Sequence, residues 1–127
     1  MLIAEANLNR KIVPIKKEVL LKPNMIGHFE YCRKKDLSTV DQINQAIMGL
    51  PSLTPNFKQV YNCIDPSYQQ QFFENTTGNK SNNPLIVLEP ILLKNKNLVQ
   101  DTVQRTFDKD GFIIHIRGFT RLIKLAA

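Results

Sequence analysis

Two histidines and two cysteines are the side chains best suited to metal or thiol chemistry: His28, Cys32, Cys63 and His115. His28 and Cys32 are four residues apart, so a helix would place both on one side, and the other two could complete a tetrahedral zinc set. However, the chain has no C-x-x-C or H-x-x-x-H pair of the kind that zinc signatures contain. Cys32 also falls on an apolar stripe, where a free cysteine behaves as a small hydrophobic residue. We therefore expect neither a metal nor a cofactor.

Catalysis by a thiol or a carboxylate has two candidates. A Cys32 nucleophile could be assisted by His28 and by the basic run that follows it. Cys32 is near the end of an expected helix, however, where the helix dipole opposes a thiolate. Glu89 lies in an apolar stretch and could act as an acid or base, but Pro90 beside it favours an exposed bulge. No glycine-rich phosphate-binding motif is present. A small enzyme without a recognisable site is therefore only the third hypothesis.

Basic and aromatic residues lie together near the end of the chain, where His115, Arg117, Phe119 and Arg121 follow Phe112. Strand aromatics surrounded by Lys and Arg stack the bases of single-stranded nucleic acid in several binding domains. The competing interpretation assigns Phe112 to the buried face of a strand, whereas Phe119 follows a glycine, breaks the alternation and would face outward. Consensus RNA-binding motifs are absent. The composition of this stretch favours a nucleic-acid surface, but no motif supports it.

The net charge of +6 is distributed in a basic, an acidic and a second basic block. Such a layout can create a positive face that attracts nucleic acid or an acidic protein surface, provided that the two basic blocks meet. Each block also has a structural explanation, since lysines protect edge strands and cations stabilise helix C-termini. The candidate binding residues are Arg10, Lys11, Lys16, Lys17, Arg33, Lys34, Lys35, His115, Arg117, Phe119 and Arg121.

Size and composition limit the class of protein. A chain of 127 residues with 43% apolar residues and no tryptophan forms one domain whose core rests on aliphatic and phenylalanine side chains. No apolar run approaches the length of a membrane span, and residues 1–9 do not resemble a signal peptide. Two cysteines suit a reducing compartment, so we expect a cytoplasmic protein, of the organism or of a host cell, without a membrane partner. Residues 124–127 resemble vector read-through, which would end the natural domain at 123.

The first two thirds of the chain predict one strand followed by short helices. Residues 10–21 form an expected basic edge strand interrupted by Pro14. A helix is expected from Met25 to Lys35, and a second begins at a capping box of Ser38 and Asp41 and ends at Gly49. A third begins at residues 54–55 and a last short segment at residues 65–66. Residues 75–84 are a polar loop.

The remaining residues predict a strand–helix–strand unit. Residues 85–88 and 91–93 are short apolar runs typical of a strand buried on both faces. Residues 98–107 repeat apolar side chains at helical spacing, and Asp110-Gly111 is expected to end that helix. The alternation from Phe112 to Arg117 predicts the closing strand.

Together these features predict a single α+β domain over residues 1–123, with a mixed sheet, an N-terminal basic strand, a helical middle and a C-terminal strand–helix–strand unit. The leading functional hypothesis is a non-enzymatic binding module for nucleic acid or an acidic protein. The alternative is an assembly protein that forms homo-oligomers or docks into a larger complex.

Overall fold

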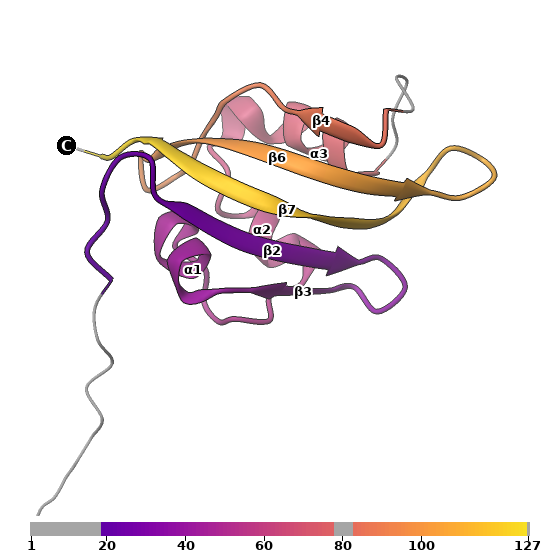
Figure 1. The fold of residues 1–127 in the computed structure, drawn as a ribbon, viewed down its shortest axis with the longest axis horizontal. Helices are drawn as coiled ribbons and strands as arrows, with labels where there is room; N and C mark the ends of the chain where they lie inside the picture. The colour runs from indigo at the N-terminus through magenta and orange to yellow at the C-terminus, as the bar shows by residue number, and fades with distance from the viewer. Residues whose placement is uncertain (1–18, 78–82, 127) are drawn as a thin grey trace, which may run out of the picture.

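The computed structural model describes residues 19–77 and 83–126, which form one antiparallel sheet with helices on one of its faces (Figure 1). The strands are β2 (Ile26–Cys32), β3 (Leu37–Val40), β4 (Leu85–Val87), β5 (Ile91–Leu92), β6 (Leu98–Phe107) and β7 (Ile113–Lys124). Their order is β3-β2-β7-β6-β4, with β5 also paired to β6. The predicted α+β class is confirmed, but the sheet described is antiparallel rather than mixed.

All the helices of the described residues lie between β3 and β4 in the chain and behind the sheet in Figure 1. They are α1 (Gln42–Met48), α2 (Phe57–Tyr61), the 3-10 turn η2 (Pro66–Tyr68) and α3 (Gln69–Thr77). The main core lies between this layer and the sheet, where Ile47 of α1 meets Val99 of β6 and Leu122 of β7, each fully buried. A sheet with one covered and one open face should alternate apolar and polar residues, and β2 and β7 do so.

The helix expected from Met25 to Lys35 is wrong, because these residues form β2 and the turn that follows it. Apolar residues at 26, 29 and 32 fit a helix, yet Gly27, Phe29 and Tyr31 also fit a strand with period two. β2 pairs with β3 on one side and with β7 on the other. These long-range ladders decide the conformation, since short segments of ambiguous pattern follow their tertiary partners.

The helix expected over residues 98–107 is also wrong, since they form β6, the strand between β7 and β4. Val99 and Val103 are buried on the inner face, and β-branched residues of this kind favour strands. Asp110-Gly111 therefore belongs to the turn of a β6–β7 hairpin, in which Gly111 has a φ of 85°. The C-terminal unit is a long hairpin and not strand–helix–strand.

The start of α1 differs from the predicted capping box, while its end agrees with the prediction. Ser38 lies in β3, and Asp41 is the N-cap, whose Oδ1 accepts a hydrogen bond from the Asn44 backbone at 2.8 Å. Gly49 ends the helix in the left-handed conformation, as expected. The predicted cap of the next helix is two residues early, because Asn56 caps α2 through a box with Gln59.

Two further expectations concern strands. β4 is an exposed edge strand in which Leu85 and Val87 are 64% and 59% exposed, so the prediction of a strand buried on both faces is wrong there. The expected N-terminal strand over residues 10–21 lies almost wholly outside the described residues, and residues 19–21 form no strand.

The polar loop predicted over residues 75–84 begins later than expected, because its first three residues belong to α3, which continues to Thr77. Among the described residues, none of the helices is long and apolar enough to cross a membrane.

Candidate functional site

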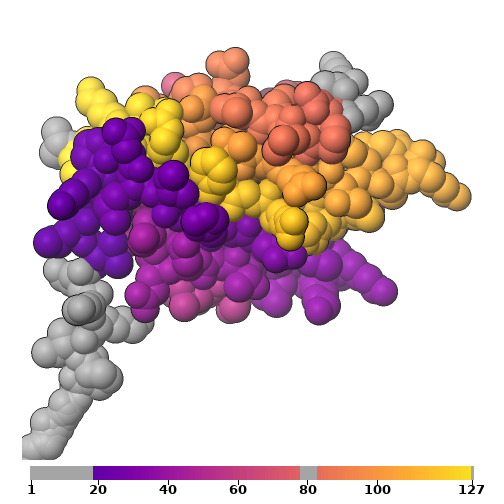
Figure 2. Space-filling model, in the orientation of Figure 1, coloured from indigo at the N-terminus to yellow at the C-terminus, as the bar shows by residue number. Residues whose placement is uncertain are grey.

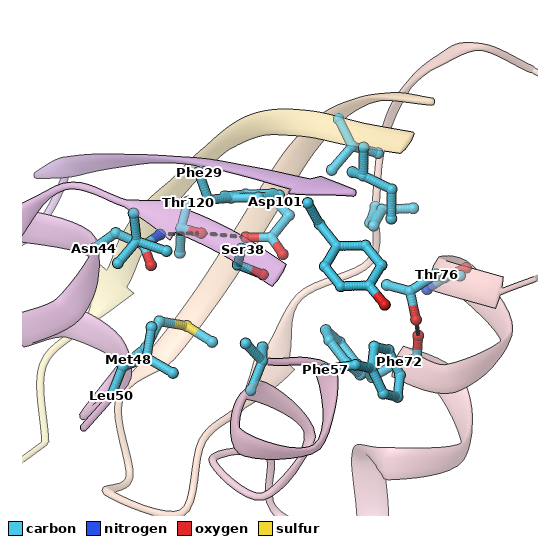
Figure 3. Close-up of a pocket in the computed structure, with 17 residues that line it drawn as sticks. Phe29, Ser38, Asn44, Met48, Leu50, Phe57, Phe72, Thr76, Asp101 and Thr120 are labelled. Carbon is cyan, nitrogen blue, oxygen red and sulfur yellow. Dashed lines mark hydrogen bonds between the residues drawn. The ribbon is translucent and has the colours of Figure 1, made fainter. Parts of the chain in front are cut away.

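A cavity of about 60 Å³ lies between the inner face of the sheet and the helices (Figure 3). Most of its wall is apolar and includes the rings of Phe29, Tyr31, Phe57 and Phe72. Its polar lining residues are Ser38, Asn44, Asn75, Thr76, Asp101 and Thr120. A mostly apolar cavity with a few fixed polar groups is the usual form of a small-molecule site.

Three of these polar residues form a hydrogen-bonded chain, drawn as dashed lines in Figure 3. Asn44 of α1 donates from Nδ2 to the Thr120 hydroxyl at 3.1 Å, and that hydroxyl donates to Asp101 Oδ1 at 2.7 Å. Thr120 and Asp101 are register partners on β7 and β6. Asn44 reaches them because α1 begins against Gly27 of β2, where an added Cβ would lie 2.4 Å from the Asn44 backbone nitrogen. These hydrogen bonds thus join α1 to β7 and β6.

Asp101 is the only charged residue in the described cavity wall. Desolvation by burial raises the pKa of its carboxyl to about 6, and the hydrogen bond from Thr120 opposes this shift. No donor among the described residues bonds its second oxygen. In Figure 3 that oxygen points away from Thr120, toward the space between sheet and helices. The wall therefore presents one acceptor oxygen that the protein does not satisfy.

The other polar residues of the wall differ in their hydrogen bonding. Ser38 is 5% exposed, and its hydroxyl forms no hydrogen bond within the described part of the chain. The Thr76 hydroxyl donates to the Phe72 carbonyl at 2.7 Å, so its proton is used in a hydrogen bond within α3. Tyr31 donates from its phenol to Asp36 at 3.0 Å, and burial together with this bond raises its pKa to about 12. Of these three hydroxyls, the one of Ser38 is therefore available to a ligand, as a donor or as an acceptor.

Arg105 is a second buried charge on the inner face of β6, next to the cavity wall rather than in it. Its guanidinium donates to the Asn83 carbonyl at 2.6 Å and to the Asn75 carbonyl, near the end of α3, at 3.5 Å. It also lies over the Phe107 ring, 5.5 Å from the centroid. A cation at a helix C-terminus is favourable, so Arg105 has a structural role in holding α3.

Sequence reasoning missed the cavity residues, because it assigned the stretch containing Asp101 to a helix. The sequence nevertheless contained a pattern that indicates the position of Asp101. Val99 and Val103 mark one face of a strand with period two, and Asp101 stands between them on that face. An acidic residue in an apolar register indicates a buried carboxylate once the strand is recognised.

Four of the predicted binding residues lie on the opposite, open face of the sheet, which faces the viewer in Figure 2. His115, Arg117, Phe119 and Arg121 are alternate residues of β7, so one side of the strand carries all four. A shallow groove of about 550 Å³ crosses this face and is lined by Arg117 and Phe119. The structure therefore brings together the C-terminal part of the predicted surface.

Polar neighbours already engage the cations of this face. His115 Nε2 lies 2.6 Å from Glu30 Oε2, and Arg117 donates from Nε to Gln104 at 3.4 Å. Arg121 donates to the side chains of Asn24 and Gln100, at 3.1 and 3.0 Å. The open face is thus a mixed polar surface with some positive charge, which is less than a purely basic one would offer to a polyanion.

The other predicted binding residues do not join this face in the described structure. Arg33, Lys34 and Lys35 are exposed in the β2–β3 turn, where Arg33 pairs with Asp108 at 3.4 Å. Their basic run therefore marks a hairpin turn and not the last turn of a helix. The predicted residues Arg10, Lys11, Lys16 and Lys17 lie outside the described residues.

Cys32 and His115 are register partners on the neighbouring strands β2 and β7, but His28 and Cys63 do not join them. His28 and Cys32 lie on one face of β2, four residues apart along a strand instead of one helical turn, which separates them by roughly 13 Å. His28 Nδ1 lies 3.3 Å from Asp41, and Cys63 hydrogen bonds to the Gly49 and Gln59 carbonyls. Burial raises the pKa of the Cys63 thiol. Within residues 19–77 and 83–126, no group of three His, Cys, Asp or Glu side chains could hold a metal ion.

Comparison with known proteins finds similarity to solved structures alone. No family model and no curated protein matches the sequence. One of the similar structures is the N-terminal domain of a diguanylate cyclase with a PAS/PAC sensor from Marinobacter aquaeolei. It has a TM-score of 0.50 and 13% identity, and the match covers 77% of this chain and 94% of that domain. At this level of identity the likeness concerns the fold alone.

Proposed function

We propose that this chain is a non-enzymatic binding module that holds a small molecule between its sheet and its helices. The observation that carries the proposal is the cavity itself, in which an apolar wall surrounds the Asp101 carboxylate with one oxygen left unsatisfied. Asp101 is half-buried, and an acceptor that lies in a mostly apolar wall without a protein partner gains from a donor that a ligand brings. A bound ligand would supply the missing donor.

The structural neighbour is compatible with this proposal. It is described as part of a diguanylate cyclase with a PAS/PAC sensor, so a sensor role, in which ligand binding is passed to another domain or protein, is the form of binding function that we propose. The free cysteines Cys32 and Cys63 fit our further proposal that the protein works in the reducing environment of a cytoplasm.

The cavity volume limits the size of the ligand. An engineered apolar cavity of about 150 Å³ accepts benzene, which has six non-hydrogen atoms. A cavity of about 60 Å³ should therefore accept a ligand of roughly two to four such atoms without rearrangement. Met48 in the wall is flexible enough to make room for one somewhat larger.

The experiment is a titration of the ¹⁵N-labelled protein with small alcohols, amines and carboxylates, followed by amide chemical shifts. At least one class should shift the amides of Asn44, Asp101 and Thr120. Val103→Leu extends a cavity-lining side chain into the space and should abolish the effect, whereas Gln104→Leu, on the open side of β6, should preserve it. If no class shifts the cavity amides, the proposal is wrong.

A second candidate function is binding of a nucleic acid or an acidic protein on the open face, because four predicted residues share that side of β7. Binding to a fluorescent single-stranded oligonucleotide should weaken steeply with salt. Arg117→Ala should reduce the slope of log affinity against log salt concentration by about one. Lys94→Ala, an exposed substitution outside the groove, should leave that slope unchanged. Absence of binding at low salt would exclude the nucleic-acid version.

A further inference from the structure

We infer that the cavity selects a small organic cation, a primary ammonium ligand whose N–H groups donate to Asp101. This inference rests on the proposed function, since it names the ligand class of the same cavity. Three independent properties of the wall lead to it: its charge, its balance of donors and acceptors, and its aromatic content.

The charge of the wall favours a cation. Asp101 is acidic, and no Lys, Arg or His side chain lines the cavity among the described residues. A carboxylate buried without a counter-ion is costly, and a ligand of opposite charge offsets that cost. An anionic ligand would face repulsion from Asp101 at neutral pH. The Ser38 hydroxyl in the same wall can donate or accept, so it is compatible with a donating ligand.

The balance of donors and acceptors selects a ligand that donates. In the chain from Asn44 through Thr120 to Asp101, the Thr120 hydroxyl proton and one N–H of Asn44 are already used. The second oxygen of Asp101 and the side-chain oxygen of Asn44 have no donor among the described residues. An ammonium group has three donors and no acceptor, so it complements this end of the cavity.

The aromatic wall favours the same ligand class. Phe57 is the centre of a ring cluster, with its centroid 6.1 Å from that of Tyr31 and 5.8 Å from that of Phe72. Phe29 lines the cavity as well, on β2. Aromatic faces attract ammonium groups, most strongly where water is excluded. The same rings accommodate the short alkyl part of an amine.

Binding should depend on pH through Asp101. The cavity residues around its carboxylate include Asn44 of α1, Thr120 of β7, Phe29 of β2 and Ser38 of β3, none of which titrates (Figure 3). Tyr31 is the other titratable group of the wall, and it stays neutral near pH 7 because burial raises its pKa. An ammonium ligand requires ionised Asp101, whose pKa is about 6, so its affinity should fall as the pH drops below that value.

The test is a comparison of three probes of similar size at constant ionic strength and pH 7.5: ethylammonium chloride, 1-propanol and sodium propionate. Ethylammonium should shift the amides of Asn44, Asp101 and Thr120, and it should bind at least about tenfold more weakly to Asp101→Asn, which removes the charge at nearly constant shape. The same loss should occur in the wild type at pH 5. Glu30→Gln, which removes an acid from the open face, should retain wild-type binding.

The outcomes separate this inference from the proposed function. If propanol or propionate shifts the cavity amides and ethylammonium does not, the ligand class is wrong and the small-molecule cavity stands. If ethylammonium binds Asp101→Asn as well as the wild type, or shifts only the open face around Glu30, the inference is also wrong. If none of the three probes reaches the cavity, both fail. Loss of ethylammonium binding in Val103→Leu, with binding kept in Gln104→Leu, would support both.

Discussion

Asp101 occupies a position on the inner face of β6 where the neighbouring inward residues are Val99 and Val103. Its carboxyl is held by Thr120, and burial raises its pKa to about 6. A residue that costs stability when ionised is expected at a functional site more often than in a purely structural core. This is the physical reason for assigning the cavity a role.

The same pKa gives a prediction about stability. The folded state binds the proton of Asp101 more tightly than the unfolded chain, so this contribution to stability is fully present below pH 3.8 and is lost as the pH rises through about 6. The loss is about 2 kcal/mol, after allowance for partial exposure of the residue. Asp101→Asn cannot ionise, so its stability relative to the wild type should rise by about 2 kcal/mol between pH 4 and pH 7.5.

Urea denaturation of both proteins at the two pH values measures this difference. Asp110→Asn, an exposed substitution in the β6–β7 turn, controls for the change in net charge. A relative stability that stays constant with pH, or that falls, would show that Asp101 is not a buried carboxyl.

At the scale of elements, the position of α1 decides whether Asn44 reaches the cavity. The helix begins at the Asp41 cap, and its first turn lies directly on β2 at Gly27. A side chain at position 27 would meet the backbone of Asn44, which cannot move without displacing the helix. Glycine at this position therefore links the packing of α1 to the hydrogen bond between Asn44 and Thr120.

Gly27→Ala should therefore destabilise the protein by about 3 kcal/mol, because a methyl group 2.4 Å from the backbone forces the helix away from the sheet. Gly49→Ala is the matched control. Its φ of 74° costs an alanine about 1–2 kcal/mol, but the nearest atom to the new Cβ is 3.4 Å away. Thermal or urea unfolding should rank Gly27→Ala as the more severe change. The reverse order would contradict the packing of α1 described above.

The sequence predicted those elements whose ends carry local signals. Gly49 ends α1, and Pro66 begins η2 after the Asp65 cap, because capping depends on a few neighbouring residues. β2 and β6 were predicted as helices because their apolar residues fit both periods. Their conformation as strands is decided by pairing with β7, and for β2 that partner lies about ninety residues away in the chain. Pairing between residues so far apart cannot be inferred from the pattern of neighbouring residues.

On the scale of the whole molecule, the two faces of the sheet have different chemistry. The face that the helices cover in Figure 1 contains the cavity, and the open face carries Arg117, Phe119 and the histidine–carboxylate pairs. The sequence predicts that Phe119 faces outward because it follows a glycine and breaks the apolar alternation, and in the structure it lies with Arg117 on the open face. The cavity could not be predicted, because its wall combines β2, β3, β6, β7 and all three α-helices, and only their packing creates the space.

The most direct test of the cavity is a high-resolution crystal structure of the protein grown with ethylammonium chloride. We predict density for the probe in the cavity, with its nitrogen about 2.7–2.9 Å from the Asp101 oxygen that Thr120 does not bond. Thr120 and Asn44 should keep the hydrogen bonds described above. A structure in which the helices close onto the sheet, so that the second oxygen of Asp101 is bonded by another side chain and no space for a ligand is left, would contradict the proposal.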